Sequence, residues 1–524
     1  MTTVKHVHRK FSTRRSTTDW KNIYIVSIFA FIDAFQFAFF VWTFWPYVQQ
    51  LDPSMTTSFV GLIMAASGIG EAVAAPILGF WTNKCGKIIP PLVASVIISM
   101  IGNVIYMCLN EIPLHLRTPA LLISRFLNGA GSGNRGTYFA YIAAASDPTD
   151  RARSMALSGG GALIGLNVGP AIQMLFTWVG DDGIELGFMR LSMYTCPALL
   201  ALVINLASII LLITMLDDGL DRNEPEDLDN ISTYSIAAAN DSDLERNVVS
   251  TIRLDVLAVV VCMLTRAARM LITANIESIG SPFSEVMFDL DKASALDFNS
   301  RMQAAVGVLT TFMFFIYVFT DYSKWVSERL NCFLAMIALL FFHLITFSWP
   351  FLSGNLTSCS RFQKSLNDTS DFTQDWTWCE ELRPVNIWFY YISYAIIFGI
   401  GLPCLNNSLQ SLYSQILGKG RQGTMQGLNQ AVGCISRILG PLLMSSVFSL
   451  YGPKATWLIE IILISVCLIV WLFVYRRLTP AVEVKEREIV VEESEGVENP
   501  ACRRSSMVSE ISIVATDDVM KRVK

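Results

Sequence analysis

The sequence predicts an all-α polytopic membrane protein with twelve transmembrane helices in two six-helix halves. Hydrophobic residues make up 52% of the 524 residues and charged residues only 16%, and the charges cluster between long apolar stretches. Each stretch must be helical, because lipid cannot satisfy the backbone of a lone strand or loop. A small-residue run that follows Arg151 and ends in Gly169-Pro170 also has a counterpart that follows Arg421 and ends in Gly440-Pro441. We interpret the two runs as the fifth helices of duplicated halves.

Twelve apolar runs approach the roughly 20 residues that a helix needs to cross hydrocarbon. The first is long enough to span and lacks a small-residue cleavage site, so we expect it to be an anchor and not a cleaved signal. The predicted spans are 23–44, 58–81, 89–109, 119–145, 156–178, 191–216, 254–276, 302–320, 332–352, 387–413, 424–450 and 456–475.

Basic residues orient the chain with both termini in the cytosol. The residues before the first span contain six bases and one acid, Asp19. The short loops agree, because those on the expected inside carry Lys84, Lys87, Arg151, Arg153, Lys324, Arg329, Lys419 and Arg421, whereas those outside carry Arg117, Arg190 and Lys454.

Polar segments divide the chain into regions. The segment that joins the halves is rich in acids and too polar to form a core, so we expect a flexible cytosolic linker. The predicted regions are a basic cytosolic segment (1–22), an N-terminal six-helix bundle (23–216), the acidic linker (217–253), a C-terminal six-helix bundle (254–475) and a cytosolic tail (476–524).

The segment 353–386 lies on the predicted lumenal side. It holds two glycosylation sequons, at Asn355 and Asn367. Of the eleven cysteines, only Cys359 and Cys379 share this oxidising loop, so they are the candidates for a disulfide.

Ionisable residues within the spans are candidates for function, because an ionisable group in hydrocarbon costs roughly 2.5–3.5 kcal/mol and must face protein or a water-filled cavity. Outside the ninth and twelfth spans, five arginines and three acids lie within the predicted helices. Arginine's planar fork suits carboxylate, phosphate or sulfate, so the surplus of positive charge favours an anionic ligand. The eight residues are Asp33, Glu71, Arg125, Arg135, Arg266, Arg269, Glu277 and Arg437.

In the seventh span, Arg266, Arg269 and Glu277 share one helical stripe. They either line the solute path or neutralise one another to hold the bundle together. Pro282 is expected to interrupt or end this helix.

In the fourth span, Arg125 lies one turn before a series of glycines that lets a neighbouring helix come close. It either contributes to a site or holds the carbonyl groups of a neighbouring helix. Arg135, nearer the cytosolic end, has the further alternative of extending its side chain to the interface.

Asp33 and Glu71 are the candidates for proton coupling, because a carboxyl group in an apolar site can bind and release a proton at accessible pH. The alternative is permanent pairing with an intramembrane arginine. His343 is expected to be a hydrogen-bonded packing residue, and Glu460 to lie near the outer end of its helix and reach the interface.

No sequence feature indicates an enzyme. The chain has no nucleotide-binding loop with Lys-Ser/Thr, no metal-spaced His/Cys set and only four histidines. We therefore expect no metal, cofactor or nucleic acid, and the expected partners are a small-molecule or ion substrate and the lipid bilayer. The oligomeric state is not predicted.

The loop after the second span reads Gly79-Phe-Trp-Thr-Asn83-Lys84-Cys-Gly86-Lys87. It resembles the Gly-x-x-x-Asp-Arg-x-Gly-Arg signature of the major facilitator superfamily, with Asn and Lys substituted, and we interpret it as a gating loop. Arg125 and its glycines are similar to the fourth-span arginine motif of that superfamily, and Gly165-x-x-x-Gly169-Pro170 to its fifth-span antiporter motif. The resemblance implies two halves of nested inverted repeats around a central cavity.

Further motifs resemble the lysosomal family of neuronal ceroid lipofuscinosis type seven, which implies a lysosomal membrane, a glycosylated loop and a link to chloride conductance. The chain departs from this family at Asp33, where the family has a small polar residue, at Glu71, where it has Gln, and at Phe139, where it has the fourth-span arginine. The matching motifs are Trp45-Pro46-Tyr47, Asp52-Pro53, Thr57-Ser58-Phe59, Ser154-Met155, Met193-Tyr194-Thr195, Glu277 with Pro282, Leu412-Tyr413-Ser414, Ile416-Leu417-Gly418 and Arg437-Ile-Leu-Gly440-Pro441.

The leading hypothesis is an alternating-access carrier, a symporter or antiporter, of a small anionic solute across a late-endosomal or lysosomal membrane, with the plasma membrane as the alternative location. The other hypotheses are an anion channel on the same fold and a membrane scaffold that does not transport.

Overall fold

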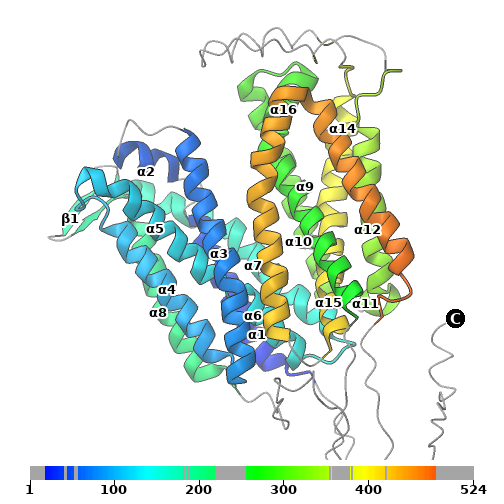
Figure 1. Ribbon diagram of the computed structural model, residues 1–524. Coiled ribbons are helices and arrows are strands. Elements are labelled where there is room, and N and C mark those ends of the chain that lie inside the picture. Colours follow the sequence, from blue (N-terminus) through cyan, green and yellow to red (C-terminus); the bar gives the residue numbers. More distant parts are fainter. Residues whose placement is uncertain are drawn as a thin grey trace, which may run out of the picture. The chain divides into compact units, whose positions relative to one another are not determined.

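The computed structural model describes residues 18–39, 44–51, 57–180, 183–186, 189–218, 255–320, 322–352, 356, 378, 382–418 and 422–479. Long helices make up most of this part (Figure 1). In chain order the elements are α1 (Trp20–Phe39), α2 (Phe44–Leu51), α3 (Thr57–Cys85), α4 (Ile89–Met107), α5 (Leu114–Ser132), α6 (Arg135–Ala145), α7 (Arg151–Leu175), η1 (Phe176–Val179), β1 (Ile184–Leu186), β2 (Met189–Leu191), α8 (Cys196–Met215), α9 (Val256–Phe288), α10 (Lys292–Phe319), α11 (Tyr322–Trp325), α12 (Glu328–Ile345), α14 (Ile387–Ile396), η3 (Ile397–Gly401), α15 (Leu402–Leu417) and α16 (Gln422–Val474).

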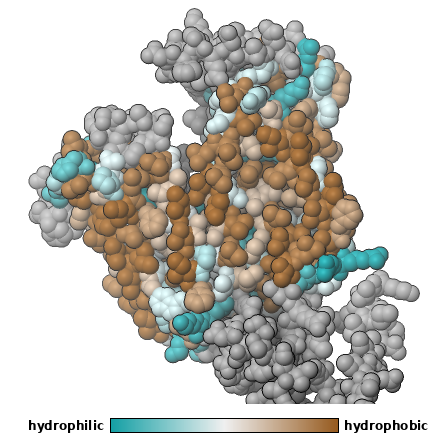
Figure 2. Space-filling view, viewed as in Figure 1, coloured by the Kyte–Doolittle hydropathy of each residue, from teal (hydrophilic) through white to brown (hydrophobic). Residues whose placement is uncertain are grey.

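The helices account for the twelve predicted spans. Within the described residues, nine helical stretches are long and apolar enough to cross a membrane, and α14, η3 and α15 together form one of them. Three more crossings come from the second half of α16, from α5 with α6, and from α7, whose glycines and serines lower its hydropathy. Figure 2 shows hydrophobic side chains covering the outer faces of the helices between more hydrophilic ends, as a lipid-embedded bundle requires.

Several helices begin at a side-chain cap that satisfies otherwise unpaired backbone N–H groups. Asp255 accepts from Leu257 and Ala258 at the start of α9, and Asn386 accepts from Trp388 and Phe389 at the start of α14. Each of these short polar residues stands directly before an apolar run. The predicted starts of the seventh and tenth spans are therefore close to the observed starts of α9 and α14.

The seventh span is longer than predicted, because α9 continues through Pro282 to Phe288. The prediction that Pro282 interrupts or ends the helix was therefore wrong. Proline removes the hydrogen bond to the Ser278 carbonyl, but the helix continues, and in its next turn Ser284 Oγ donates to the Gly280 carbonyl at 2.8 Å. The turn beyond is also held by aromatic packing, since the Phe283 ring stacks on Trp457 with centroids 4.2 Å apart.

The fourth span is divided between α5 and α6 at Gly133 and Asn134. Its glycines permit close packing on α3: a Cβ atom added to Gly129 would lie 1.8 Å from the Ser67 carbonyl oxygen. The division starts a new helix at Arg135 and so places that side chain in the interior of the bundle.

The internal repeat appears as a repeated helix pair, because α7 packs along α1 and α16 packs along α9. A Cβ atom added to Gly165 would lie 2.4 Å from the Phe31 carbonyl oxygen, and one added to Gly169 would lie 2.4 Å from Ala38 Cβ. Gly440 makes the looser contact, 3.2 Å to the Leu271 carbonyl oxygen. Both α7 and α16 continue past the prolines of the repeat, Pro170 and Pro441.

The eleventh and twelfth spans form α16, which bends at Gly452. Gly452 has φ 77°, a left-handed conformation that suits glycine. The bend returns the chain across the membrane and brings Trp457 and Glu460 into the core of the second half.

Candidate functional site

Helices α3 and α16 meet at the end of α3 that leads into α4. A Cβ atom added to Gly79 would lie 2.2 Å from the Gly423 carbonyl oxygen. Asn83 spans the same contact, since its Nδ2 donates to Thr424 Oγ1 at 2.9 Å and its Oδ1 accepts from the Gly423 N–H at 3.0 Å. Toward their other ends the two helices diverge (Figure 1). The two halves therefore touch, backbone to backbone, on the side predicted to be cytosolic.

The predicted gating loop contributes to this contact through only part of its length. Gly79 and Asn83 lie against α16, whereas Lys84 and Lys87 are exposed. Gly86 adopts φ 65°, the left-handed conformation that turns the chain from α3 into α4.

Replacing Gly79 by alanine is expected to destabilise the protein by about 1–3 kcal/mol, because the added Cβ overlaps the Gly423 carbonyl group and forces the helices apart. Gly61, on the same helix, has nothing within 4 Å of an added Cβ atom and is the matched control. Thermal unfolding compares the two variants, and the distance between spin labels at positions 84 and 428 detects the separation. Equal effects of both substitutions would show that the contact does not constrain the protein.

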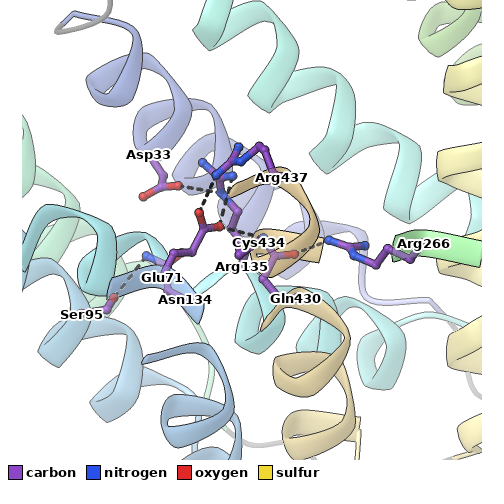
Figure 3. Close-up of polar contacts among 9 residues, drawn as sticks. All are labelled: Asp33, Glu71, Ser95, Asn134, Arg135, Arg266, Gln430, Cys434 and Arg437. Carbon is purple, nitrogen blue, oxygen red and sulfur yellow. Dashed lines mark hydrogen bonds and ion pairs between the residues drawn. The ribbon is translucent and has the colours of Figure 1, made fainter. Parts of the chain in front are cut away.

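Four charged side chains from four helices form an ion-pair cluster beyond this contact (Figure 3). Glu71 of α3 is central, with Oε2 2.9 Å from Arg437 Nη2 of α16 and Oε1 3.4 Å from Arg135 Nη1 of α6. Arg135 Nε also lies 3.5 Å from Asp33 Oδ2 of α1. Glu71 is nearly inaccessible, at 4% exposure of its side chain, whereas Arg437 is 38% exposed. The cluster is neutral as a set, and its Glu71–Arg437 pair joins the two halves.

Glutamines extend the cluster through the second half. Gln430 Nε2 donates to Glu71 Oε1 at 2.8 Å, and its Oε1 accepts from Arg266 Nη2. Arg266 Nη1 donates to Gln410 Oε1 at 3.1 Å, and Gln410 Nε2 donates to Gln426 Oε1 at 2.7 Å. Our sequence reasoning missed these glutamines because it considered charges alone. The sequence does contain a feature that could have identified them. Gln422, Gln426 and Gln430 are spaced four residues apart, which places three amides on one face of an apolar helix.

Arg266 is a buried cation held only by neutral acceptors. A salt bridge requires an N···O distance of at most 4.0 Å. Within the described residues, no carboxylate lies that close to Arg266 or to Arg269. Gly433 makes room for Arg266, since a Cβ atom there would lie 2.8 Å from Arg266 Nε. Of the predicted stripe, Glu277 is exposed and, among the described residues, forms no ion pair with either arginine. The stripe is therefore not neutralised from within.

Arg125 belongs to a separate cavity inside the first half. Its guanidinium lies over the Tyr106 ring, 4.7 Å from the centroid. The cavity, of about 60 Å³, also has Asp33 in its wall, so it adjoins the ion-pair cluster. Asn103 Oδ1 and Asn205 Nδ2 are buried in this wall without a hydrogen-bond partner among the described residues, which suits a site for water or a small polar ligand.

Phe139 stands where the resemblance implies an arginine. It packs with Tyr138, ring centroids 4.8 Å apart, and lies at the margin of the apolar core of the first half. Arg135, one turn earlier, supplies a charge in its place.

A second buried polar group, inside the second half, corrects the prediction for Glu460. Its side chain does not reach the interface: Glu460 is fully buried and lies 2.7 Å from His343 Nε2. Asn275 Nδ2 donates to its other oxygen, Oε1. His343 Nδ1 lies 2.8 Å from the Leu339 carbonyl oxygen, so this histidine is hydrogen-bonded packing, as predicted.

Some predicted features lie outside the described residues. These are Asn355, Asn367, Cys359 and Cys379, together with most of the linker and both terminal segments. Within the described ranges, no group of three or more His, Cys, Asp or Glu side chains is arranged to hold a metal ion.

Comparisons with known proteins agree on one family. The sequence profile described as "Major Facilitator Superfamily" matches residues 26–360 and 376–516. "Major facilitator superfamily domain-containing protein 8" of Xenopus laevis is 26% identical over 483 residues, which cover 88% of this chain and 92% of that protein.

Solved structures share the fold at low sequence identity. A bacterial homologue of the iron transporter ferroportin, in an outward-facing state, has a TM-score of 0.60 at 11% identity and covers 87% of this chain and 99% of its own. The E. coli fucose:proton symporter FucP has a TM-score of 0.58 at 13% identity, with coverage of 86% and 98%. The human organic anion transporter MFSD10 (TETRAN) has a TM-score of 0.55 at 15% identity, with coverage of 86% and 99%.

Proposed function

This chain belongs to the major facilitator superfamily, and we propose that it carries a small anionic solute across its membrane by alternating access. The observation that supports an anionic solute is the pair Arg266 and Arg269, one turn apart on α9 and without a carboxylate partner in the described part of the chain. A buried charge is stable only when it is paired or well solvated. An anion that enters between the halves supplies the missing partner of Arg266, and the charge of Arg269, one turn further along α9, adds to the attraction.

The ion-pair cluster gives the solute a way to change the arrangement of the halves. Glu71 of the first half is bound by Arg437 and Gln430 of the second, and both contacts must break when the halves separate on this side. An anion that binds Arg437 competes with Glu71 for its N–H groups, and an anion that binds Arg266 competes with Gln430, the residue that also donates to Glu71. Binding of the solute and release of the contact are thereby linked.

Glu71 and Asp33 are the proposed points of proton coupling. When Glu71 loses Arg437, its remaining basic neighbour is Arg135, which it shares with Asp33. Two carboxyl groups that share one guanidinium repel each other, and a proton on either removes the repulsion. Uptake driven by an imposed pH gradient is the expected consequence. The similarity to major facilitator superfamily domain-containing protein 8 supports a late-endosomal or lysosomal membrane as the location, with the plasma membrane as the alternative.

Replacing Arg266 by glutamine is expected to reduce anion uptake into proteoliposomes at least tenfold, since a charge-assisted interaction contributes about 1.5–3 kcal/mol. The probes are radiolabelled phosphate, sulfate and small mono- and dicarboxylates, each tested alone. The control is Arg301→Gln, because Arg301 is 71% exposed and pairs with Asp297 on its own helix.

Uptake that is equal in Arg266→Gln, Arg437→Ala and the unaltered protein would contradict the proposed site. Patch recording of the same liposomes tests the channel alternative, since unitary anion currents are not expected from a carrier. A scaffold that does not transport predicts no uptake of any probe by the unaltered protein.

A further inference from the structure

An apolar groove on the outer surface lies between the two halves. Its volume is about 280 Å³, and its walls come from three helices, α1 and α7 of the first half and α10 of the second. Each helix contributes one stripe at helical spacing. The stripes are Tyr24, Ile28 and Phe31; Leu157, Gly160 and Ile164; and Thr311, Phe315 and Phe319.

The groove offers little to a polar occupant. Two of the three hydroxyl groups in its wall are already used, since Ser27 Oγ donates to the Ile23 carbonyl at 2.7 Å and Thr311 Oγ1 donates to the Gly307 carbonyl at 2.8 Å; the third belongs to Tyr24. Large apolar side chains are otherwise left exposed, among them Ile28 and Phe315. Glycines of α7 form the floor, where a Cβ atom on Gly160 would lie 3.3 Å from Phe314 Cβ. In a membrane-spanning segment, the molecule that meets such a surface is a hydrocarbon chain.

Polar and aromatic groups gather at one end of the groove, on the side predicted to be cytosolic. Arg153 precedes Leu157 by one turn on the same face of α7, and its guanidinium lies 4.9 Å from the centroid of the Trp20 ring. Trp20 in turn lies one turn before Tyr24 on α1, with ring centroids 6.2 Å apart. Tryptophan and tyrosine favour the level of lipid headgroups.

Arg153 is available to an anion at this end. No carboxylate lies within salt-bridge distance of its guanidinium in the part of the chain that the structure describes, so no ion pair neutralises its charge. A basic side chain at the membrane surface attracts a negatively charged headgroup.

We propose that this groove binds a membrane phospholipid, with one acyl chain between α1, α7 and α10 and its phosphate at Arg153. The site is independent of the interior cluster and of the proposed solute. Because its walls belong to both halves, the bound lipid stabilises the arrangement in which α7 and α10 lie side by side.

Photocrosslinking of the full-length protein in nanodiscs tests the site. The probe is a phosphatidylserine with a diazirine on one acyl chain, and labelled peptides are mapped by mass spectrometry. The labels are expected to concentrate on residues 24–31, 157–164 and 311–319. Leu157→Trp fills the groove and is expected to reduce that labelling severalfold. The matched control is Leu206→Trp, because Leu206 is 54% exposed on α8 and outside the groove.

The headgroup is tested with Arg153→Gln. Its affinity for the phosphatidylserine probe is expected to fall roughly fivefold, which corresponds to about 1 kcal/mol for one basic side chain near the surface. Arg301→Gln is the control, and thermal unfolding confirms that each variant is folded.

Three results would overturn the proposal. One is labelling spread evenly over all lipid-facing helices, and another is labelling of the groove that Leu157→Trp leaves unchanged. The third is equal affinity for a diacylglycerol probe that lacks the phosphate. None depends on transport, so the proposed function can fail without affecting this result.

Discussion

Replacing Glu71 by glutamine is expected to abolish anion uptake and to destabilise the protein by about 2–3 kcal/mol. The substitution keeps the shape of the side chain but removes the charge that faces Arg437 at 2.9 Å and Arg135 at 3.4 Å. Breaking a fully buried pair costs about 3–5 kcal/mol, and partial exposure of Arg437 lowers that figure here. Arg135 retains Asp33, whereas Arg437 is left with no carboxylate at salt-bridge distance among the described residues.

Thermal unfolding and uptake into proteoliposomes measure the two effects separately. Glu111→Gln is the control for removal of a carboxylate, because Glu111 is exposed in the turn between α4 and α5 and forms no ion pair with a described residue. A double-mutant cycle with Arg437→Gln should show a coupling energy of about 0.5–3 kcal/mol. If the two substitutions are additive in stability and harmless to uptake, the cluster does not join the halves as we propose.

Replacing Glu460 by leucine is expected to be the most destabilising change, by about 3–5 kcal/mol, whereas Glu460→Gln is expected to be nearly neutral. The reason is the number of protons that the contacts require. His343 Nδ1 must donate to the Leu339 carbonyl oxygen, so the contact between Nε2 and Glu460 Oε2 needs one further proton, on either atom. The two side chains then carry no net charge together, which suits a site with no access to water.

A glutamine reproduces every contact of this site. Its amide N–H donates to His343 Nε2, and its oxygen accepts from Asn275 Nδ2. Leucine leaves both partners unsatisfied in the core of the second half. Chemical or thermal unfolding of the two variants decides between them, with the double variant His343→Leu/Glu460→Leu expected to recover much of the lost stability. A Glu460→Gln variant as unstable as Glu460→Leu would show that the site depends on charge and not on hydrogen bonding.

The prediction for Glu460 failed for a local reason. Its distance from the apparent end of the span suggested an interfacial position, because α16 turns only a few residues earlier, at Gly452. The seventh helix extends further than its apolar run suggested, since α9 continues past Pro282 and stacks Phe283 on Trp457. A proline in the sequence suggests the end of a helix, but aromatic packing between helices can offset its cost. Hydropathy does not detect such an extension, because it contains no information on that packing.

The structure adds the environment of each predicted arginine. Asp33, Glu71, Arg135 and Arg437 were recognised singly as charges in spans, and the structure brings all four together. In this arrangement each acid is paired with an arginine, and the proposed proton coupling requires the Glu71–Arg437 pair to open. Arg125 and Arg269 instead line smaller cavities within their own halves.

Sequence by itself determined the number of spans, the duplication of the halves and the places where charge enters the membrane. These properties are local: a span is a sum of hydropathy over about 20 neighbouring residues, and a repeat is a pattern within one helix. Only the tertiary structure decided which charges meet. Glu71 and Arg437 lie on different halves of the chain, and Arg266 is surrounded by glutamines from two other helices. Such contacts depend on the packing of helices distant in sequence, and this packing decides whether a buried charge is compensated or is left to bind a ligand.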